Sequence, residues 1–163
     1  SWVSGDVSNK FDDVLVLAGD MPLVRTESLR RLLARQRAEG NAVTVLSAEL
    51  DDPSGYGRVI RDGSGQFEKI VEEKDASAAE RAVREVNSGI YVFEKGPLQD
   101  ALGRLRADNA QKEYYLTDTL AILRRDGRRV GVERASDPRE CFGVNTPDQL
   151  RMVEETLRAW GEG

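Results

Sequence analysis

Asp20 follows a short apolar run and is the first side chain along the sequence that could do chemistry. The run Val-Leu-Val-Leu at 14–17 is bounded by Gly19 and Pro22, which is typical of a buried strand in a parallel sheet. Ligands of open α/β sheets bind beyond the carboxyl ends of the strands. A carboxylate at that edge could hold a metal ion against a phosphate. Asp20 could equally start a turn whose next step is fixed by Pro22.

Asn145 is the candidate for a second metal ligand, because one exposed carboxylate is a weak site. It follows an apolar stretch at 141–144, which we expect to be a strand, and precedes Thr146, the expected cap of a helix. An amide oxygen and a carboxylate oxygen suit Mg²⁺, which keeps its other positions for water and phosphate oxygens. Alternatively, Asn145 is a turn residue ahead of the cap.

Three further positions could contact a polar ligand. Gly57 lies in a loop where glycines permit close approach to a ligand. Glu72 ends an apolar strand, where a buried carboxylate could accept hydrogen bonds from sugar hydroxyls. Asn87 interrupts another apolar strand, and a buried amide must be satisfied by a ligand or by neighbouring backbone. Each also has a purely structural interpretation. Gly57 could belong to a tight turn, Glu72 could lie on a solvated charged face, and the Asn87 amide could be bonded to neighbouring backbone.

The composition of the 163-residue chain limits its chemistry and its partners. It holds no histidine, which removes the commonest general base and transition-metal ligand. Its one cysteine, Cys141, cannot form an internal disulfide, so we expect a reducing, cytoplasmic location and a buried small side chain instead of a nucleophile. The net charge of −5 argues against nucleic acid. No apolar run approaches the ~20 residues of a membrane span, so no membrane partner is expected.

The elements that must position these residues follow from hydrophobic periodicity and capping signals. Ser77 with Glu80, and Thr146 with Gln149, have the spacing of capping boxes at helix starts, and Thr117 is expected to cap another helix. A strand, a helix and a strand at the start predict a parallel unit with a right-handed crossover. We expect strands at 13–18, 42–46, 86–93, 129–133 and 141–144, a hairpin at 58–61 and 67–72, and helices at 26–39, 97–106, 117–126 and from 147 onward.

In their order and spacing, several segments resemble the uridylyltransferase domain of bacterial N-acetylglucosamine-1-phosphate uridylyltransferases. Those bifunctional enzymes also carry a glucosamine-1-phosphate N-acetyltransferase. The resemblance covers about 12–160, so that 1–163 is one partial nucleotidyltransferase domain with a poorly defined lead-in at 1–11. It rests on Ala-Gly-Asp-Met-Pro-Leu (18–23), Asp-Asp-Pro-Ser-Gly-Tyr-Gly-Arg (51–58), Ile-Val-Glu-Glu-Lys-Asp-Ala (70–76), Glu-Val-Asn-Ser-Gly-Ile-Tyr (85–91), Asn-Ala-Gln-Lys-Glu-Tyr-Tyr-Leu-Thr-Asp (109–118) and Gly-Val-Asn (143–145).

The resemblance implies a fold and a set of site residues. The fold is a Rossmann-like, GT-A type three-layer α/β/α sandwich, with a mostly parallel sheet and a hairpin insertion, here without its first βα units. Asp20 and Asn145 match the family's Mg²⁺ ligands and would act catalytically through the metal. Gly57, Glu72 and Asn87 match contacts to the N-acetylglucosamine part. The positions that the resemblance assigns to substrate binding are Ala18, Gly19, Asp20, Gly57, Glu72, Asn87 and Asn145.

The implied reaction is attack of the phosphate oxygen of N-acetylglucosamine 1-phosphate on the α-phosphorus of UTP. It releases pyrophosphate and yields UDP-N-acetylglucosamine for peptidoglycan synthesis. No covalent intermediate is needed, because positioning and electrostatics carry such a transfer. The family trimerises through its C-terminal acetyltransferase domain, so the parent protein is expected to be a homotrimer.

Two departures from the family pattern bear on activity. Ala18 stands where the family often has Tyr. The Gly-rich loop of the type Leu-Ala-Ala-Gly-x-Gly-Thr-Arg-Met, the uracil contacts and the C-terminal left-handed β-helix are not in this sequence. We therefore expect the isolated chain to be inactive and an uncovered sheet edge to favour association. The alternatives are a transferase for another sugar 1-phosphate or nucleotide, and a non-catalytic module that binds a sugar phosphate or a partner domain.

Overall fold

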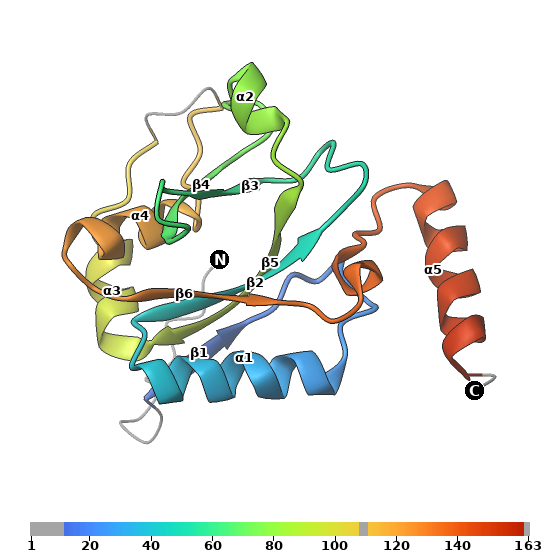
Figure 1. Ribbon diagram of the computed structural model, residues 1–163, viewed down its shortest axis with the longest axis horizontal. Coiled ribbons are helices and arrows are strands. Elements are labelled where there is room, and N and C mark those ends of the chain that lie inside the picture. The colour runs from blue at the N-terminus through green and yellow to red at the C-terminus, as the bar shows by residue number, and fades with distance from the viewer. Residues whose placement is uncertain (1–11, 108–110, 162–163) are drawn as a thin grey trace.

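A six-stranded sheet forms the centre of the computed structural model, which describes residues 12–107 and 111–161 (Figure 1). The hydrogen-bonded order is β4-β3-β5-β2-β6, and β1 also pairs with β5. None of the described helices is both long and apolar enough to cross a membrane. The strands are β1 (Asp13–Val16), β2 (Val43–Glu49), β3 (Arg58–Arg61), β4 (Phe67–Val71), β5 (Glu85–Glu94) and β6 (Val130–Arg134); the helices are α1 (Thr26–Glu39), α2 (Ala78–Arg81), α3 (Lys95–Leu102), α4 (Asp118–Arg125) and α5 (Pro147–Gly161).

Helices cover both faces of the sheet, which confirms the expected three-layer α/β arrangement. One core cluster joins side chains such as Val45 and Phe93 to Leu98 of α3 and Leu120 of α4. The other joins alternate sheet positions to Leu32 of α1. Burial on both faces explains why the central strands are apolar at nearly every position.

The sheet is mixed, although we expected it to be mostly parallel. Among the described strands, β2 and β6 alone are parallel neighbours, and the remaining pairs are antiparallel. The first strand–helix–strand unit does not join paired strands, because β5 lies antiparallel between β1 and β2. Hydrophobic periodicity locates strands but does not say which strand is inserted between two others, so this part of the prediction was wrong.

β5 continues through the Asn-Ser-Gly sequence at 87–89, where we expected an interruption. The backbone absorbs the irregularity in two ways. Gly89 adopts a left-handed φ of 75°, and the register against β2 shifts between Val45 and Ser47. Such a bulge bends a strand without ending it.

The segment 141–144 is not a strand, which corrects a second prediction. A 3₁₀ turn, Pro138–Cys141, ends there and an unpaired segment follows. The Asp137 side chain starts the turn by accepting a hydrogen bond from the backbone of Arg139. Cys141 is fully buried as expected, and burial raises the pKa of its thiol to about 12, which excludes a nucleophilic role at neutral pH.

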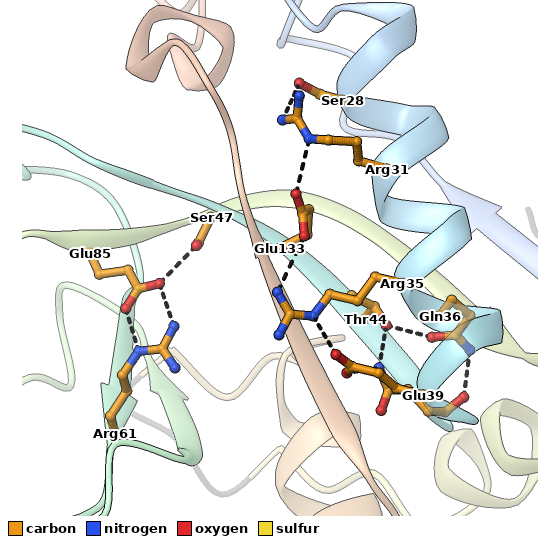
Figure 2. A network of polar contacts seen from close by, with 11 residues as sticks. Ser28, Arg31, Arg35, Gln36, Glu39, Thr44, Ser47, Arg61, Glu85 and Glu133 are labelled. Atoms are coloured by element: carbon orange, nitrogen blue, oxygen red, sulfur yellow. Dashed lines mark hydrogen bonds and ion pairs between the residues drawn. The ribbon is translucent and has the colours of Figure 1, made fainter.

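A polar network lies between α1 and the strands beneath it (Figure 2). Glu133 of β6 accepts hydrogen bonds from Arg31 at 3.0 Å and from Arg35 at 3.3 Å. Deeper in the interface, the Thr44 hydroxyl donates to the Gln36 amide oxygen at 2.6 Å. These pairs add polar links to the apolar contacts of Leu32 that hold α1 on the sheet.

Candidate functional site

Asp20 and Asn145 lie close together, on two loops that a backbone hydrogen bond joins. The Val144 N–H donates to the Asp20 carbonyl oxygen at 2.9 Å. A Cβ atom built on Gly143 would lie 3.5 Å from Asp20 Oδ2 and 3.6 Å from Asn145 Nδ2. The two side chains therefore border one small space, which a glycine at 143 leaves open.

The donor set around this space suits a hard cation. Asp20 and Asn145 are both exposed and would supply one carboxylate and one amide oxygen. In the described part of the chain, no group of three His, Cys, Asp or Glu side chains could complete a metal site. An ion held here would take its other ligands from water and substrate, which is how Mg²⁺ is commonly bound beside phosphates.

Tyr56 connects the loop at 142–146, here called the Asn145 loop, to the glycine-containing loop that precedes β3. The Gly143 N–H donates to the Tyr56 hydroxyl oxygen at 3.2 Å. Our sequence analysis assigned Tyr56 no role, although an aromatic residue between Gly55 and Gly57 was the available signal. Its hydroxyl positions the backbone beside Asp20.

Gly57, Glu72 and Asn87 form a second cluster, contributed by the start of β3, the end of β4 and β5. The Asn87 N–H donates to the Gly57 carbonyl oxygen at 2.8 Å. A Cβ atom on Gly57 would lie 3.1 Å from Glu72 Oε2. The absence of a side chain at 57 therefore lets the Glu72 carboxylate approach the backbone.

The amide oxygen of Asn87 is already engaged within the protein. It accepts hydrogen bonds from the Gly89 N–H and from the Tyr91 hydroxyl, each at 3.0 Å. Burial raises the pKa of Tyr91, so its hydroxyl stays protonated and can donate. Among the described residues no acceptor bonds the Asn87 side-chain nitrogen, which leaves its N–H groups as donors for a ligand. Tyr91 is a positioning residue that our sequence analysis missed, because nothing local shows what its hydroxyl reaches.

Glu72 is a partly buried carboxylate with one neutral donor. Burial raises its pKa, and the nearby Asp118 and Asp75 raise it further, against the lowering effect of a hydrogen bond from Thr117. The Thr117 hydroxyl donates to Glu72 Oε1 at 3.0 Å. Thr117 occupies the N-cap position of α4, but its side chain makes no capping hydrogen bond. The hydroxyl that we expected to cap the helix donates to the Glu72 carboxylate instead.

The two clusters adjoin where Ala18 meets the β5 irregularity. A Cβ atom on Gly89 would lie 3.2 Å from the Ala18 Cβ, so the loop that carries Gly19 and Asp20 packs against the segment that carries Asn87. All seven positions singled out from the sequence thus lie in one region.

Two cavities flank this region. The larger, about 1030 Å³, lies between β4, α4 and the segment 103–106 that follows α3; Glu72, Tyr115, Thr117 and Asp118 line it on one side. The smaller, about 540 Å³, is lined by Tyr56, Gly143 and residues near the start of α5. The region therefore has open space on both sides. Glu72 faces one cavity, and the Asn145 loop borders the other.

Comparisons with known proteins agree on the class. A model of the nucleotidyl transferase family matches residues 2–158. The chain is 56% identical over 145 residues to a bifunctional protein GlmU of Streptomyces avermitilis, covering 88% of this chain and 30% of that protein. It is 52% identical over 154 residues to a bifunctional protein GlmU of Corynebacterium aurimucosum, covering 89% and 32%. The chain spans about a third of the length of these curated relatives.

A solved structure supports the fold. The chain superposes with a TM-score of 0.66 on a putative glucose-1-phosphate thymidylyltransferase from Bacillus anthracis, which was crystallised in complex with a sucrose. The match covers 90% of this chain and 55% of that one at 19% identity. At 19% identity this similarity supports the fold and no conclusion about function.

Proposed function

Because the chain belongs to the nucleotidyl transferase family, we propose that it supplies sugar and metal contacts for uridylyl transfer in its parent protein. The proposed reaction joins UTP and N-acetylglucosamine 1-phosphate to give UDP-N-acetylglucosamine and pyrophosphate, with Mg²⁺. The observation that carries the proposal is the junction of two clusters: Asp20 with Asn145 around Gly143, and Gly57 with Glu72 and Asn87 beside it. The cytoplasmic, homotrimeric parent expected from the resemblance belongs to the same proposal.

The surroundings of each residue support a particular contact with the sugar or with the metal ion. Glu72 accepts hydrogen bonds from sugar hydroxyls, and the Asn87 N–H groups donate to the acyl or hydroxyl oxygens of the sugar. Gly57 lets the Glu72 carboxylate lie against the backbone, next to where the sugar would bind. Asp20 and Asn145 would hold Mg²⁺, which would neutralise phosphate charge when bound.

In the proposed reaction the protein orients the two substrates and forms no covalent bond with either. Cys141 is buried with a raised pKa, and the sequence has no histidine. The acceptor oxygen is already part of a phosphate, so its attack on the α-phosphorus requires alignment above all. These features fit direct transfer between two bound substrates.

The test measures pyrophosphate release from UTP, N-acetylglucosamine 1-phosphate and Mg²⁺ by the parent-length protein. We expect Asp20→Asn and Asn145→Ala to lower kcat/KM on the order of 100-fold, as removal of a contact to developing charge does. Asp100→Asn, on the exposed surface of α3, is the matched control and should leave the rate unchanged. Full activity of Asp20→Asn would contradict the proposed metal role.

The same assay separates the alternatives. Faster turnover of another sugar 1-phosphate or nucleotide would replace the proposed substrates. Binding of N-acetylglucosamine 1-phosphate by the parent without turnover of any such pair would favour the non-catalytic module. We also propose that the 163-residue chain alone does not turn over, because the Gly-rich loop of the resembled family is not in its sequence. Robust pyrophosphate release by the purified chain would contradict that statement.

A further inference from the structure

A third cavity, a cleft that none of the seven candidate site residues lines, is bordered by five arginines. It has a volume of about 290 Å³ and lies between β6, the β3–β4 hairpin and the turn from α4 to β6. Glu39 is the one carboxylate in its lining, although the chain as a whole has a net charge of −5. The arginines are Arg35, Arg61, Arg124, Arg128 and Arg129.

The cleft lies toward the end of the sheet opposite to the candidate site. Asn41, Arg128 and Arg129 immediately precede β2 and β6. Asp20 instead follows β1, which points in the same direction as those strands. A ligand in the cleft would therefore be separate from the proposed reaction.

Three of the five arginines are held by carboxylates around the cleft. Arg35 contacts Glu133, and Arg61 binds Glu85 at 2.7 Å (Figure 2). Arg124 binds Asp62 of the hairpin turn at 2.7 Å. These pairs fix the walls, because each joins residues from different elements.

Arg128 and Arg129 differ from the other three. Both are exposed, and no carboxylate of the described residues lies within ion-pair distance of either guanidinium group. They are adjacent on the turn after Gly127, whose φ of 74° reverses the chain at the end of α4. Glu39 and Asp126 act on Arg129 and Arg128 only from beyond ion-pair distance. Two adjacent cations without a carboxylate in direct contact repel each other and attract a divalent anion. The guanidinium fork matches phosphate oxygens in geometry as well as in charge.

The floor of the cleft is polar and tightly packed, because Gly131 of β6 lies directly against Asn41. Gly131 contributes backbone without a side chain, and the Asn41 side chain beside it is fixed by hydrogen bonds to Glu39 and Thr44. We propose that this cleft binds a small phosphate-bearing anion, with Arg128 and Arg129 as its main contacts. The proposal does not depend on the transferase activity.

The test titrates the 163-residue chain with inorganic pyrophosphate in buffer that contains EDTA, so that no metal bridges the anion to Asp20. Calorimetry should give saturable binding, and backbone amide NMR shifts should change at Gly127, Gly131 and Asn41. The double variant R128A/R129A should bind at least about tenfold more weakly, since it loses two charge-assisted contacts. Because both side chains lack ion pairs among the described residues, its amide spectrum should otherwise remain that of the folded chain.

The charge-matched control is R151A/R158A, which removes two exposed arginines from α5. It should keep the wild-type affinity. Three results would overturn the proposal: no saturable binding, equal weakening in both double variants, or shift changes centred on Gly143 and Asn145 instead of the cleft.

Discussion

At the scale of single residues, the surroundings of Glu72 lower the stability of the fold but suit the binding of hydroxyl groups. Folding removes much of its water, and the single neutral donor described beside its carboxylate is the Thr117 hydroxyl. An ionised carboxylate in such a place costs stability, yet it is a strong acceptor for hydroxyl groups. The proposed role in sugar binding would explain why a residue that destabilises the folded state is kept at this position.

We expect Glu72→Gln to raise the Tm of the chain at pH 7. The pKa of Glu72 is raised in the folded state, so its ionisation disfavours folding. This penalty grows as the pH rises from the ordinary carboxyl pKa to the raised pKa and is complete above it. The penalty is absent below the ordinary carboxyl range. The gain in Tm should therefore shrink toward pH 4, as thermal unfolding at both pH values would show. An equal gain at pH 4 and pH 7 would contradict this account.

Side chains with the right chemistry could be predicted from the sequence, and their positioning partners could not. Asp20 and Asn145 were paired as candidates from residue type and local pattern, and the structure places them around Gly143. The hydroxyls of Tyr56, Tyr91 and Thr117 reach across loops and strands. Those contacts depend on the distance between elements, which no local pattern encodes.

At the scale of elements, β6 packs tightly against Asn41 and Thr44 at Gly131. A Cβ atom there would lie 2.3 Å from Asn41 Nδ2 and 2.9 Å from Thr44 Oγ1. Both groups are buried and hydrogen-bonded to each other. Their network cannot shift without losing one of its own bonds.

We expect Gly131→Ala to lower the free energy of unfolding by about 1–3 kcal/mol, the usual cost of overpacking a buried site. Urea denaturation measures it. Gly63→Ala is the control, because nothing lies within 4 Å of a Cβ at 63. A loss at 131 no larger than that at 63 would show that the network yields easily.

α5 begins where its capping signals predicted, but little of its apolar side is buried. Of Leu150, Val153, Leu157 and Trp160, which recur at helical spacing, Val153 alone is fully buried, and Leu150 and Leu157 are about half exposed. Near its end the Arg25 guanidinium lies 3.7 Å from the centre of the Trp160 ring, with Arg139 at 5.3 Å. Contacts of two cations with one aromatic ring therefore help to hold the end of α5, whose apolar residues Leu150 and Leu157 are about half exposed.

We expect Trp160→Ala to loosen α5 while the sheet stays intact. Two cation–π contacts of about 0.5–1 kcal/mol each would be lost, and hydrogen exchange in the last turns of α5 should quicken accordingly. Arg158→Ala on the same helix is the control and should change exchange little. Faster exchange throughout α1 and β2 would mean that Trp160 supports the whole domain instead.

At the scale of the whole molecule, the class was predicted correctly and the strand pairing was not. The motifs indicated a nucleotidyltransferase, which the family match over residues 2–158 confirms. The mixed sheet depends on β5 lying between β1 and β2. That arrangement joins residues about eighty positions apart, beyond the range of any turn or capping signal.

β1 has an open edge, since β5 is its one strand partner among the described residues. Leu15 and Leu17 are about half exposed there. We expect the chain to associate as its concentration rises, and Leu15→Lys to suppress association, because a charge on an edge strand opposes pairing. Sedimentation velocity over a concentration series measures this. Leu102→Lys, at an exposed leucine of α3, should not suppress it; a wild-type chain that stays monomeric throughout would contradict the expectation.

The insertion of β5 also sets the order in which the domain can form. In most strand–helix–strand units the two strands meet as soon as the helix is complete. Here β1 and β2 have no mutual ladder, and Asp13 pairs with Glu94. During synthesis, β1, α1 and β2 must therefore wait for residues 85–94 before the sheet can close. Folding dominated by such distant pairings is slow, so refolding kinetics should report a late, cooperative step in which β1 and β2 gain protection together with β5.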